Sequence, residues 1–194
     1  MDFSGYQQHQ KIDLHQEVFS DVGGLKGNVA IAYDTHIQHA IGGQGDDVLI
    51  GNDDGDVLER YAGNNFFLGG KGGDVMTGGP GHNTYVYSDP SASSVQHPDL
   101  ITDFKTGQDV IHLSPMLANH SYSQLPTLTH IQTVESGLHV QNLLFSEPAG
   151  EPTDLGGIVV TLTDTHPDML IKVIGDVNES DIHYMDSVHS TNVA

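Results

Sequence analysis

Five nine-residue segments follow one another over residues 42–86 with no residue between them. They read GGQGDDVLI, GNDDGDVLE, RYAGNNFFL, GGKGGDVMT and GGPGHNTYV. Each follows, well or poorly, the pattern G-G-x-G-x-D-x-U-x, in which U is a large apolar residue. The pattern predicts an all-β fold, a right-handed parallel β-roll in which two repeats make one coil. A flexible Gly/Asp-rich loop would not place a large apolar residue at a fixed period.

The sixth position of the repeat supplies a polar side chain, carboxylate or amide, in every copy. The leading glycines permit tight turns, so that backbone carbonyls can face inward at an ion. An all-oxygen shell of this kind suits a hard cation such as Ca²⁺, which takes about six to eight oxygen ligands. The predicted calcium-binding residues are Gly43, Gly45, Asp47, Gly51, Asp53, Asp56, Asn65, Gly70, Gly72, Asp74, Gly79, Gly81 and Asn83.

Because two repeats make one coil, each repeat should stack on the next but one. The middle residue of each x-U-x strand should face inward, which predicts one ladder of Leu49, Phe67 and Tyr85 and a second of Leu58 and Met76. Calcium is expected between stacked loops. Asp56 with Asp74 is the strongest predicted site, Asp47 with Asn65 has one carboxylate, and Asn65 with Asn83 has none. Two or three ions are expected within residues 42–90.

Composition limits the partners that such a chain can have. Its 194 residues contain 6 Lys and Arg against 26 Asp and Glu, a formal charge of -20. Nucleic acid and anionic membrane are therefore poor partners, and no apolar stretch is long enough to span a bilayer. Repulsion among the acids opposes a compact state until counter-ions bind, so we expect calcium binding to drive folding. The absence of cysteine is compatible with either a secreted or a cytosolic protein.

The segments around the repeats also read as β-structure. We expect residues 1–41 to cap the first coil of the roll, residues 87–185 to form a β-rich cap, and residues 186–194 to be a tail. The cap is expected to be an antiparallel sheet or small sandwich that covers the last coil. The expected strands lie at Ile12–Leu14, Val29–Ala32, Leu100–Phe104, Val110–Leu113, Leu128–Val134, Leu138–Phe145, Gly157–Thr163 and Met169–Ile174, with at most a helical turn at Pro115–Asn119.

The chain resembles the C-terminal domain of the serralysins, secreted bacterial zinc endopeptidases of the metzincin group. The resemblance rests on the run SDVGGLKGNVAIA at 20–32, on DLITDFKTGQDVIHLS at 99–114, and more weakly on Met169–Ile182. It implies a calcium-binding domain that is secreted to the extracellular space, supports a protease catalytic domain and accompanies type I secretion. The sequence contains no H-E-x-x-H zinc motif, so we expect no peptidase activity from this chain.

The sequence departs from the family pattern in other places. His36 and Gln38 stand where the family usually has Thr and Glu as calcium ligands, so that flanking site is expected to be lost. After Asp181-Ile182-His183 the chain ends in mostly polar residues, whereas the family often ends in an Asp followed by apolar residues. The opening Met1-Asp2-Phe3-Ser4 does not resemble a signal peptide.

Other interpretations remain open from sequence alone. Thirteen histidines include the pairs His36 with His39 and His183 with His189, but neither has a ligand pattern for zinc. Additional calcium ligands or turn caps are possible at Asp89, Asp99, Asp103 and Asp109. The chain could instead be the non-catalytic part of a zinc endopeptidase, or an extracellular module that binds or inhibits another protein.

Overall fold

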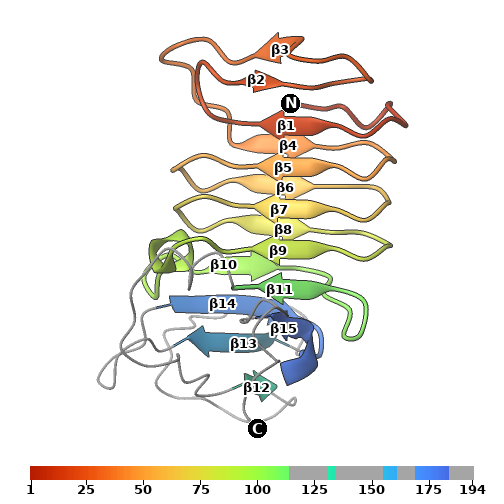
Figure 1. The fold of residues 1–194 in the computed structure, drawn as a ribbon. Coiled ribbons are helices and arrows are strands. Elements are labelled where there is room, and N and C mark those ends of the chain that lie inside the picture. The colour runs from red at the N-terminus through yellow and green to blue at the C-terminus, as the bar shows by residue number, and fades with distance from the viewer. Residues whose placement is uncertain (114–130, 134–154, 161–168, 184–194) are drawn as a thin grey trace, which may run out of the picture.

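The computed structural model describes residues 1–113, 131–133, 155–160 and 169–183. This part of the chain is built almost entirely of short strands, stacked one above another (Figure 1). None of its helices has the length and apolar character needed to cross a membrane. Its elements are β1 (Lys11–Asp13), β2 (Phe19–Ser20), β3 (Val29–Ala30), β4 (His39–Ile41), β5 (Val48–Ile50), β6 (Val57–Glu59), β7 (Phe66–Leu68), β8 (Val75–Thr77), β9 (Thr84–Val86), η1 (Pro90–Ser93), β10 (Asp99–Ile101), β11 (Val110–His112), β12 (Ile131–Thr133), β13 (Leu155–Val160), β14 (Met169–Ile174), η2 (Glu179–Asp181) and β15 (Ile182–His183).

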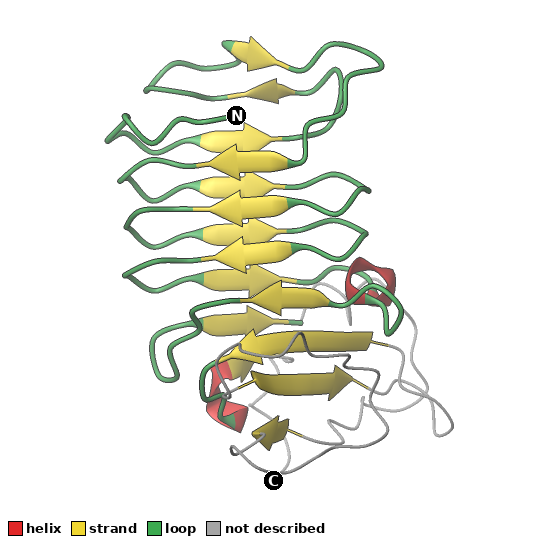
Figure 2. Ribbon diagram, turned by 180° about the vertical axis from the view of Figure 1, so that it is seen from behind, coloured by secondary structure: helices red, strands yellow, loops and turns green. Residues whose placement is uncertain are grey.

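Two sheets face each other across the core. One has the order β1-β5-β7-β9-β11-β15, and the other has the order β12-β13-β14-β10-β8-β6-β4. Successive repeats alternate between the sheets, and the strands of the repeats pair in parallel with the next but one. Figure 2 shows the loops that join the sheets along both edges of the stack. The expected parallel β-roll is confirmed.

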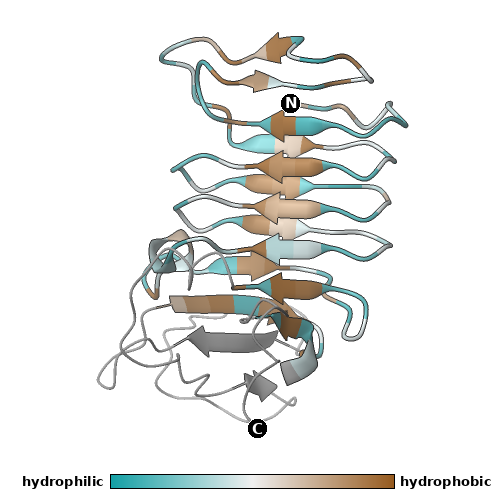
Figure 3. Ribbon diagram, viewed as in Figure 1, coloured by the Kyte–Doolittle hydropathy of each residue, from teal (hydrophilic) through white to brown (hydrophobic). Residues whose placement is uncertain are grey.

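In the five repeats the core consists of one inward side chain from each strand, β5 to β9. The register pairs Leu49 with Phe67, Phe67 with Tyr85, and Leu58 with Met76, so both predicted ladders are confirmed. All five side chains are buried, and the rings of Phe67 and Tyr85 stack with centroids 5.2 Å apart. Figure 3 shows the result, with apolar strands in the middle of the stack and polar loops at its edges.

The N-terminal segment enters the roll itself. Strand β1 pairs in parallel with β5, placing Ile12 beside Leu49, and β4 pairs in parallel with β6, placing Ala40 beside Leu58. Only β2 and β3 stand apart as a small antiparallel sheet at the end of the stack (Figure 1). The two expected strands at 12–14 and 29–32 are therefore present, shifted or shortened by one or two residues. The boundary at residue 41 stays a prediction.

Parallel stacking also continues beyond Val86. Strands β10 and β11 pair in parallel with β8 and β9, and β14 and β15 extend the same two sheets. Antiparallel pairing in the C-terminal part begins only where β13 meets β14 and β12 meets β13. The antiparallel cap therefore starts later along the chain than its β-rich sequence indicates. The expected strand at 138–145, the turn at 115–119 and the tail at 186–194 lie outside the described residues.

Candidate metal centre

The sixth-position side chains form two columns, each on the loops that lead into one of the sheets. In each column the backbone N–H or side-chain amide of one residue donates to the oxygen of the next. The first column consists of Gln10, Asp47, Asn65, Asn83 and Asp109, and the second consists of Asp56, Asp74 and Asp99. The two columns differ in the charge of their side chains and in the hydrogen-bond donors between successive members.

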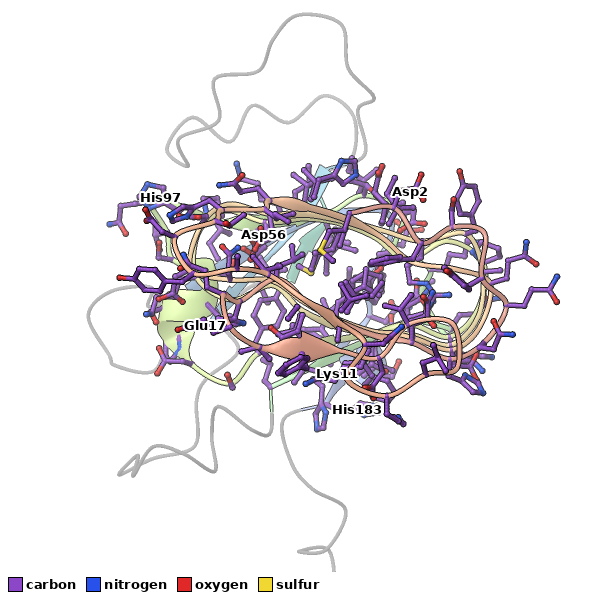
Figure 4. All side chains as sticks on the ribbon, turned by 90° about the horizontal axis from the view of Figure 1, so that it is seen from above. Asp2, Lys11, Glu17, Asp56, His97 and His183 are labelled. Atoms are coloured by element: carbon purple, nitrogen blue, oxygen red, sulfur yellow. The ribbon has the colours of Figure 1, made fainter. Side chains whose placement is uncertain are left out.

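The second column contains only carboxylates. The Asp56 N–H donates to Asp74 Oδ1 at 2.8 Å, and the Asp74 N–H donates to Asp99 Oδ1 at 3.0 Å. All three side chains are buried, yet Asp56 Oδ1, Asp74 Oδ2 and Asp99 Oδ2 have no hydrogen-bond partner. Among the ion pairs of the described residues, none includes these three acids. Figure 4, which looks along the stack, shows Asp56 within the outline of the flattened roll, toward the end where His97 lies.

Burial changes the acidity of these groups. It raises the pKa of Asp56 to about 6 and that of Asp74 to about 7, where the negative charge of Asp56 adds to the effect. Burial and the charge of Asp74 raise the pKa of Asp99 to about 8. A buried carboxylate without a counter-charge disfavours its ionised form, so a cation between these side chains would relieve a cost that the protein alone does not offset.

Backbone carbonyls approach the same place. Gly70 and Gly72 adopt φ of +101° and +115° in the loop that precedes Asp74. A Cβ on Gly70 would collide with the carbonyl oxygen of Asn52, and one on Gly72 would collide with that of Asp54. Only glycine fits where the two loops come this close. These carbonyl oxygens belong to the same pair of stacked loops as the unpartnered carboxylates of Asp56 and Asp74, and carbonyl and carboxylate oxygens are the donors that Ca²⁺ prefers.

The carboxylates and amide oxygens from Asp47 to Asp109 in the first column face N–H groups of the protein itself. The guanidinium of Arg60 lies beside Asp47, and Asn65 Nδ2 donates to Asn83 Oδ1 at 2.9 Å. Asn83 Nδ2 donates in turn to Asp109 Oδ1 at 3.1 Å. The structure therefore brings the predicted residues Asp47, Asn65 and Asn83 into line, but it places N–H groups, and no unpaired acids, between them.

The remaining predicted ligands have varied positions. Asp53 points to the surface, where its carboxylate pairs with Lys71 Nζ at 2.8 Å. A Cβ on Gly51 would collide with the Gly69 carbonyl oxygen, in the loop pair that holds Asp56 and Asp74. The other glycines of the set lie in loops packed backbone to backbone against a stacked loop, namely Gly43, Gly45, Gly79 and Gly81.

Three column members were not among the ligands predicted from the repeats. The sequence predicts turn caps or optional ligands at Asp99 and Asp109, and its repeat pattern does not include Gln10. Each begins a short D-x-U-x or Q-x-U-x run without leading glycines, as in Asp99-Leu100-Ile101. A search for that shorter pattern, dropping the glycine requirement, finds all three.

The histidines make ordinary contacts with acids. His36 Nδ1 lies 2.9 Å from Asp54 Oδ2, and His39 Nε2 lies 2.7 Å from Glu59 Oε2. The first of these hydrogen bonds raises the pKa of His36. Within the described residues no group of three or more His, Asp or Glu side chains is placed to hold a single metal ion, so a site between two column carboxylates also needs backbone carbonyl ligands. His189 lies outside the described residues.

The metal-free protein is expected to lose stability as the pH rises from about 4 to about 8. The pKa values of Asp56, Asp74 and Asp99 are raised to about 6, 7 and 8, whereas an unfolded chain has Asp near about 3.9. Between these limits the folded state holds more protons, so the free energy of unfolding falls with pH. The three protonated acids contribute fully to the free energy of unfolding below about pH 4, and this contribution is lost above about pH 8.

Urea unfolding in EDTA at a series of pH values measures this dependence. In Asp99→Asn the decrease in the free energy of unfolding should end near pH 7, because the acid with the highest pKa has been removed. An unfolding midpoint that stays constant or increases over this range would contradict the assignment of buried, unpaired acids.

Comparison with known proteins places the whole chain in context. Residues 1–184 match the family model for the peptidase M10 serralysin C terminus. The chain is 40% identical over 183 residues to metalloprotease AprA of Pseudomonas entomophila (strain L48), covering 93% of this chain and 36% of that protein. It is 38% identical over 179 residues to serralysin A of Dickeya chrysanthemi, covering 92% of this chain and 36% of that protein. A serralysin of Photorhabdus luminescens is 50% identical over 113 residues, which cover 58% of this chain and 23% of the relative.

The chain thus spans about a third, or less, of the length of these relatives. Among solved structures, it aligns with the solution structure of the AlgE6R3 subunit from the Azotobacter vinelandii mannuronan C5-epimerase. That alignment has a TM-score of 0.44 and 21% identity, and it covers 80% of this chain and 78% of the other.

Proposed function

Because the chain belongs to the peptidase M10 serralysin C-terminal family, we propose that it is a calcium-binding structural domain that folds when it meets Ca²⁺ outside the cell. The observation that carries the proposal is the column of Asp56, Asp74 and Asp99, whose buried carboxylates have no cationic partner. Calcium supplies the missing charge and accepts the converging carbonyl oxygens as ligands.

Two calcium positions follow from the column. The first lies between Asp56 and Asp74, where the carbonyls of Asn52 and Asp54 face the following loop. The second lies between Asp74 and Asp99, each with one unpartnered oxygen. Asp74 is common to both. We expect the first to bind more tightly, since its loops approach more closely than those of the second, where a Cβ on Gly73 would be 3.4 Å from the Pro98 carbonyl oxygen.

The physical setting favours action after export. Extracellular calcium modules bind with a Kd of about 10⁻⁴–10⁻³ M, so sites of this class stay empty in a low-calcium cytosol. With a formal charge of -20, the metal-free chain repels itself and resists compaction. Calcium would then convert a loosely folded chain into a stiff stack, because metal binding and folding are coupled.

The stack would support a protease catalytic domain and accompany its secretion, as the family relationship suggests. The relatives are named as proteases, and the matching family model is that of their C-terminal part. The sequence has no H-E-x-x-H motif, so within such a protein this chain contributes structure and calcium binding while another domain performs the chemistry. The whole protein's substrates lie outside this proposal.

Counting bound ions tests the proposal. We expect native mass spectrometry and equilibrium dialysis to find two Ca²⁺ per chain. EGTA should weaken the β-sheet circular dichroism and lower the midpoint of thermal unfolding, and added Ca²⁺ should restore both. Mg²⁺ at the same concentration is the control and should restore little, because it prefers a smaller octahedral shell and keeps its waters. Identical spectra in EGTA and Ca²⁺, with no ion bound, would refute calcium-driven folding.

A further inference from the structure

Arg60 stands at the first position of its repeat, where each of the other four repeats has glycine. We propose that its guanidinium is a built-in cation that takes the place of calcium between the first and third repeats. The inference rests on the proposed function, because it treats the gaps of the roll as cation sites. It differs from the prediction from the repeats, in which Asp47 and Asn65 share a calcium ion.

The Arg60 side chain is folded into the gap between the two loops. Its side chain and that of Asp47 are fully buried, and Arg60 Nη1 lies 3.8 Å from Asp47 Oδ2. Nη2 lies within hydrogen-bond distance of the carbonyl oxygens of Gly43 at 3.3 Å, Gly45 at 2.5 Å and Ala62, which share its two N–H groups, while Nε and Nη1 have no hydrogen-bond partner. Three converging carbonyls and a carboxylate around one positive centre form the environment that a small metal ion would occupy.

The gap between the second and fourth repeats, on the opposite edge of the roll, has similar surroundings without the arginine. A shift of nine residues carries Gly43, Gly45 and Asp47 onto Asn52, Asp54 and Asp56. There the equivalent carbonyls of Asn52 and Asp54 face the next loop, while Asp56 Oδ1 and Asp74 Oδ2 are buried without a partner. The gap between the first and third repeats therefore contains a cationic side chain, that of Arg60. The gap between the second and fourth repeats contains buried carboxylates without a positive partner.

Guanidinium and calcium exclude each other at this position. Arginine stays protonated in proteins and has donors but no acceptor, so it adds positive charge and blocks the carbonyl oxygens. Its burial without solvent requires a counter-charge, and Asp47 provides it at close range. The carboxylate is thus already neutralised and has no deficit for a metal ion to relieve.

The rest of the first column follows the same principle with neutral donors. Gln10 Nε2 donates to Asp47 Oδ2 at 3.3 Å, and the amides of Asn65 and Asn83 donate along the column to Asn83 and Asp109. Every gap of that column within the described residues thus has a side-chain N–H donor, whereas the donors found between the members of the other column are backbone N–H groups. Calcium would then be confined to the column of Asp56, Asp74 and Asp99, while the opposite edge of the roll is held without metal.

Replacing Arg60 with glycine tests the inference by a change in the number of ions. Arg60→Gly restores the repeat pattern and removes the internal cation, so the variant should bind one more Ca²⁺ per chain than the wild type. Arg60→Gly with Tyr61→Gly, which restores both leading glycines, should do the same. Adding Asp47→Asn to Arg60→Gly should abolish the gained ion. In EGTA, Arg60→Gly should speed amide hydrogen exchange at residues 43–47 at least tenfold, and Ca²⁺ should reverse this.

Lys71→Ala is the matched control, since it removes one positive charge from the surface of the following repeat, where Lys71 pairs with Asp53. It should leave the calcium count unchanged. In the wild type, Asp47→Asn should also leave the count unchanged, a measurement that does not depend on the folding of any Arg60 variant. A lost ion in Asp47→Asn, or a folded Arg60→Gly with the wild-type count, would overturn the inference. A wild type that binds no calcium at all would instead refute the proposed function.

Discussion

Replacing Asp74 with asparagine is expected to remove both proposed calcium ions at once, because its side chain lies between Asp56 and Asp99. Asparagine keeps the shape and one acceptor oxygen, so the hydrogen bond from the Asp56 N–H can persist. The negative charge shared by both positions is lost. Since each ion at about 100 times its Kd contributes about 2.7 kcal/mol, the loss in saturating calcium is about 5 kcal/mol.

Without calcium the same substitution should act in the opposite direction. Burial raises the pKa of Asp74 to about 7, so its ionised form is costly in the metal-free fold and a neutral amide relieves that cost. In saturating Ca²⁺, the loss of about 5 kcal/mol should lower the thermal unfolding midpoint of Asp74→Asn by roughly 10–20 °C, at about 2–4 °C per kcal/mol. In EGTA the midpoint should rise.

Asp109→Asn is the control for a charge removed from the other column. Both Asp109 oxygens already accept hydrogen bonds, from Asn83 and from the Lys105 N–H. The variant should keep its calcium ions. If Asp109→Asn lost calcium and Asp74→Asn kept it, the assignment of the two columns would be reversed.

Truncating Phe67 to alanine should be the most damaging single change in the core. The ring is fully buried, stacks on Tyr85 at 5.2 Å, and occupies the third repeat, whose leading glycines are replaced by Arg60 and Tyr61. Phe→Ala substitutions in cores cost about 3–5 kcal/mol, and a stack of coils offers little room for neighbours to collapse into the cavity. Urea unfolding followed by circular dichroism in saturating calcium measures the loss.

The neighbouring residue provides the matched control. Phe66 is the same residue type one position earlier in strand β7, but its side chain faces solvent with 48% of its surface exposed. Phe66→Ala should change the free energy of unfolding by about 0.5 kcal/mol or less, as is usual at surface sites. Comparable losses in both variants would show that the inward ladder does not determine stability.

Much of the roll could be read from the repeat. A strand alternates its side chains, so a fixed nine-residue spacing was enough to predict which side chains point inward and which repeats stack. Leu49, Phe67 and Tyr85 pair in the predicted register. The same arithmetic identified Asp56 and Asp74 as neighbours. The residues of these predictions are close in sequence and belong to one uninterrupted period.

Outside the period, sequence spacing was less informative. Asp56 and Asp74 are 18 residues apart, as two nonapeptides require, whereas Asp74 and Asp99 are 25 residues apart, and Asn83 and Asp109 are 26 apart. Residues 5–13 carry no leading pair of glycines, yet their strand β1 completes the sheet beside β5. These segments join the stack because an exposed sheet edge favours any strand that can pair with it, a tendency that a local motif does not reveal.

The sequence by itself therefore determined the architecture of the roll, its inward ladders and the acidic pair most suited to a divalent cation. Only the tertiary structure decided which gap receives a cationic side chain of the chain itself. In the repeat pattern, Arg60 is only a position where glycine is missing. In the folded chain its long side chain points inward and contacts Asp47 and three carbonyl oxygens. The physical reason is that backbone periodicity fixes where the loops stack, but a flexible side chain reaches its partners across a gap that exists only after stacking.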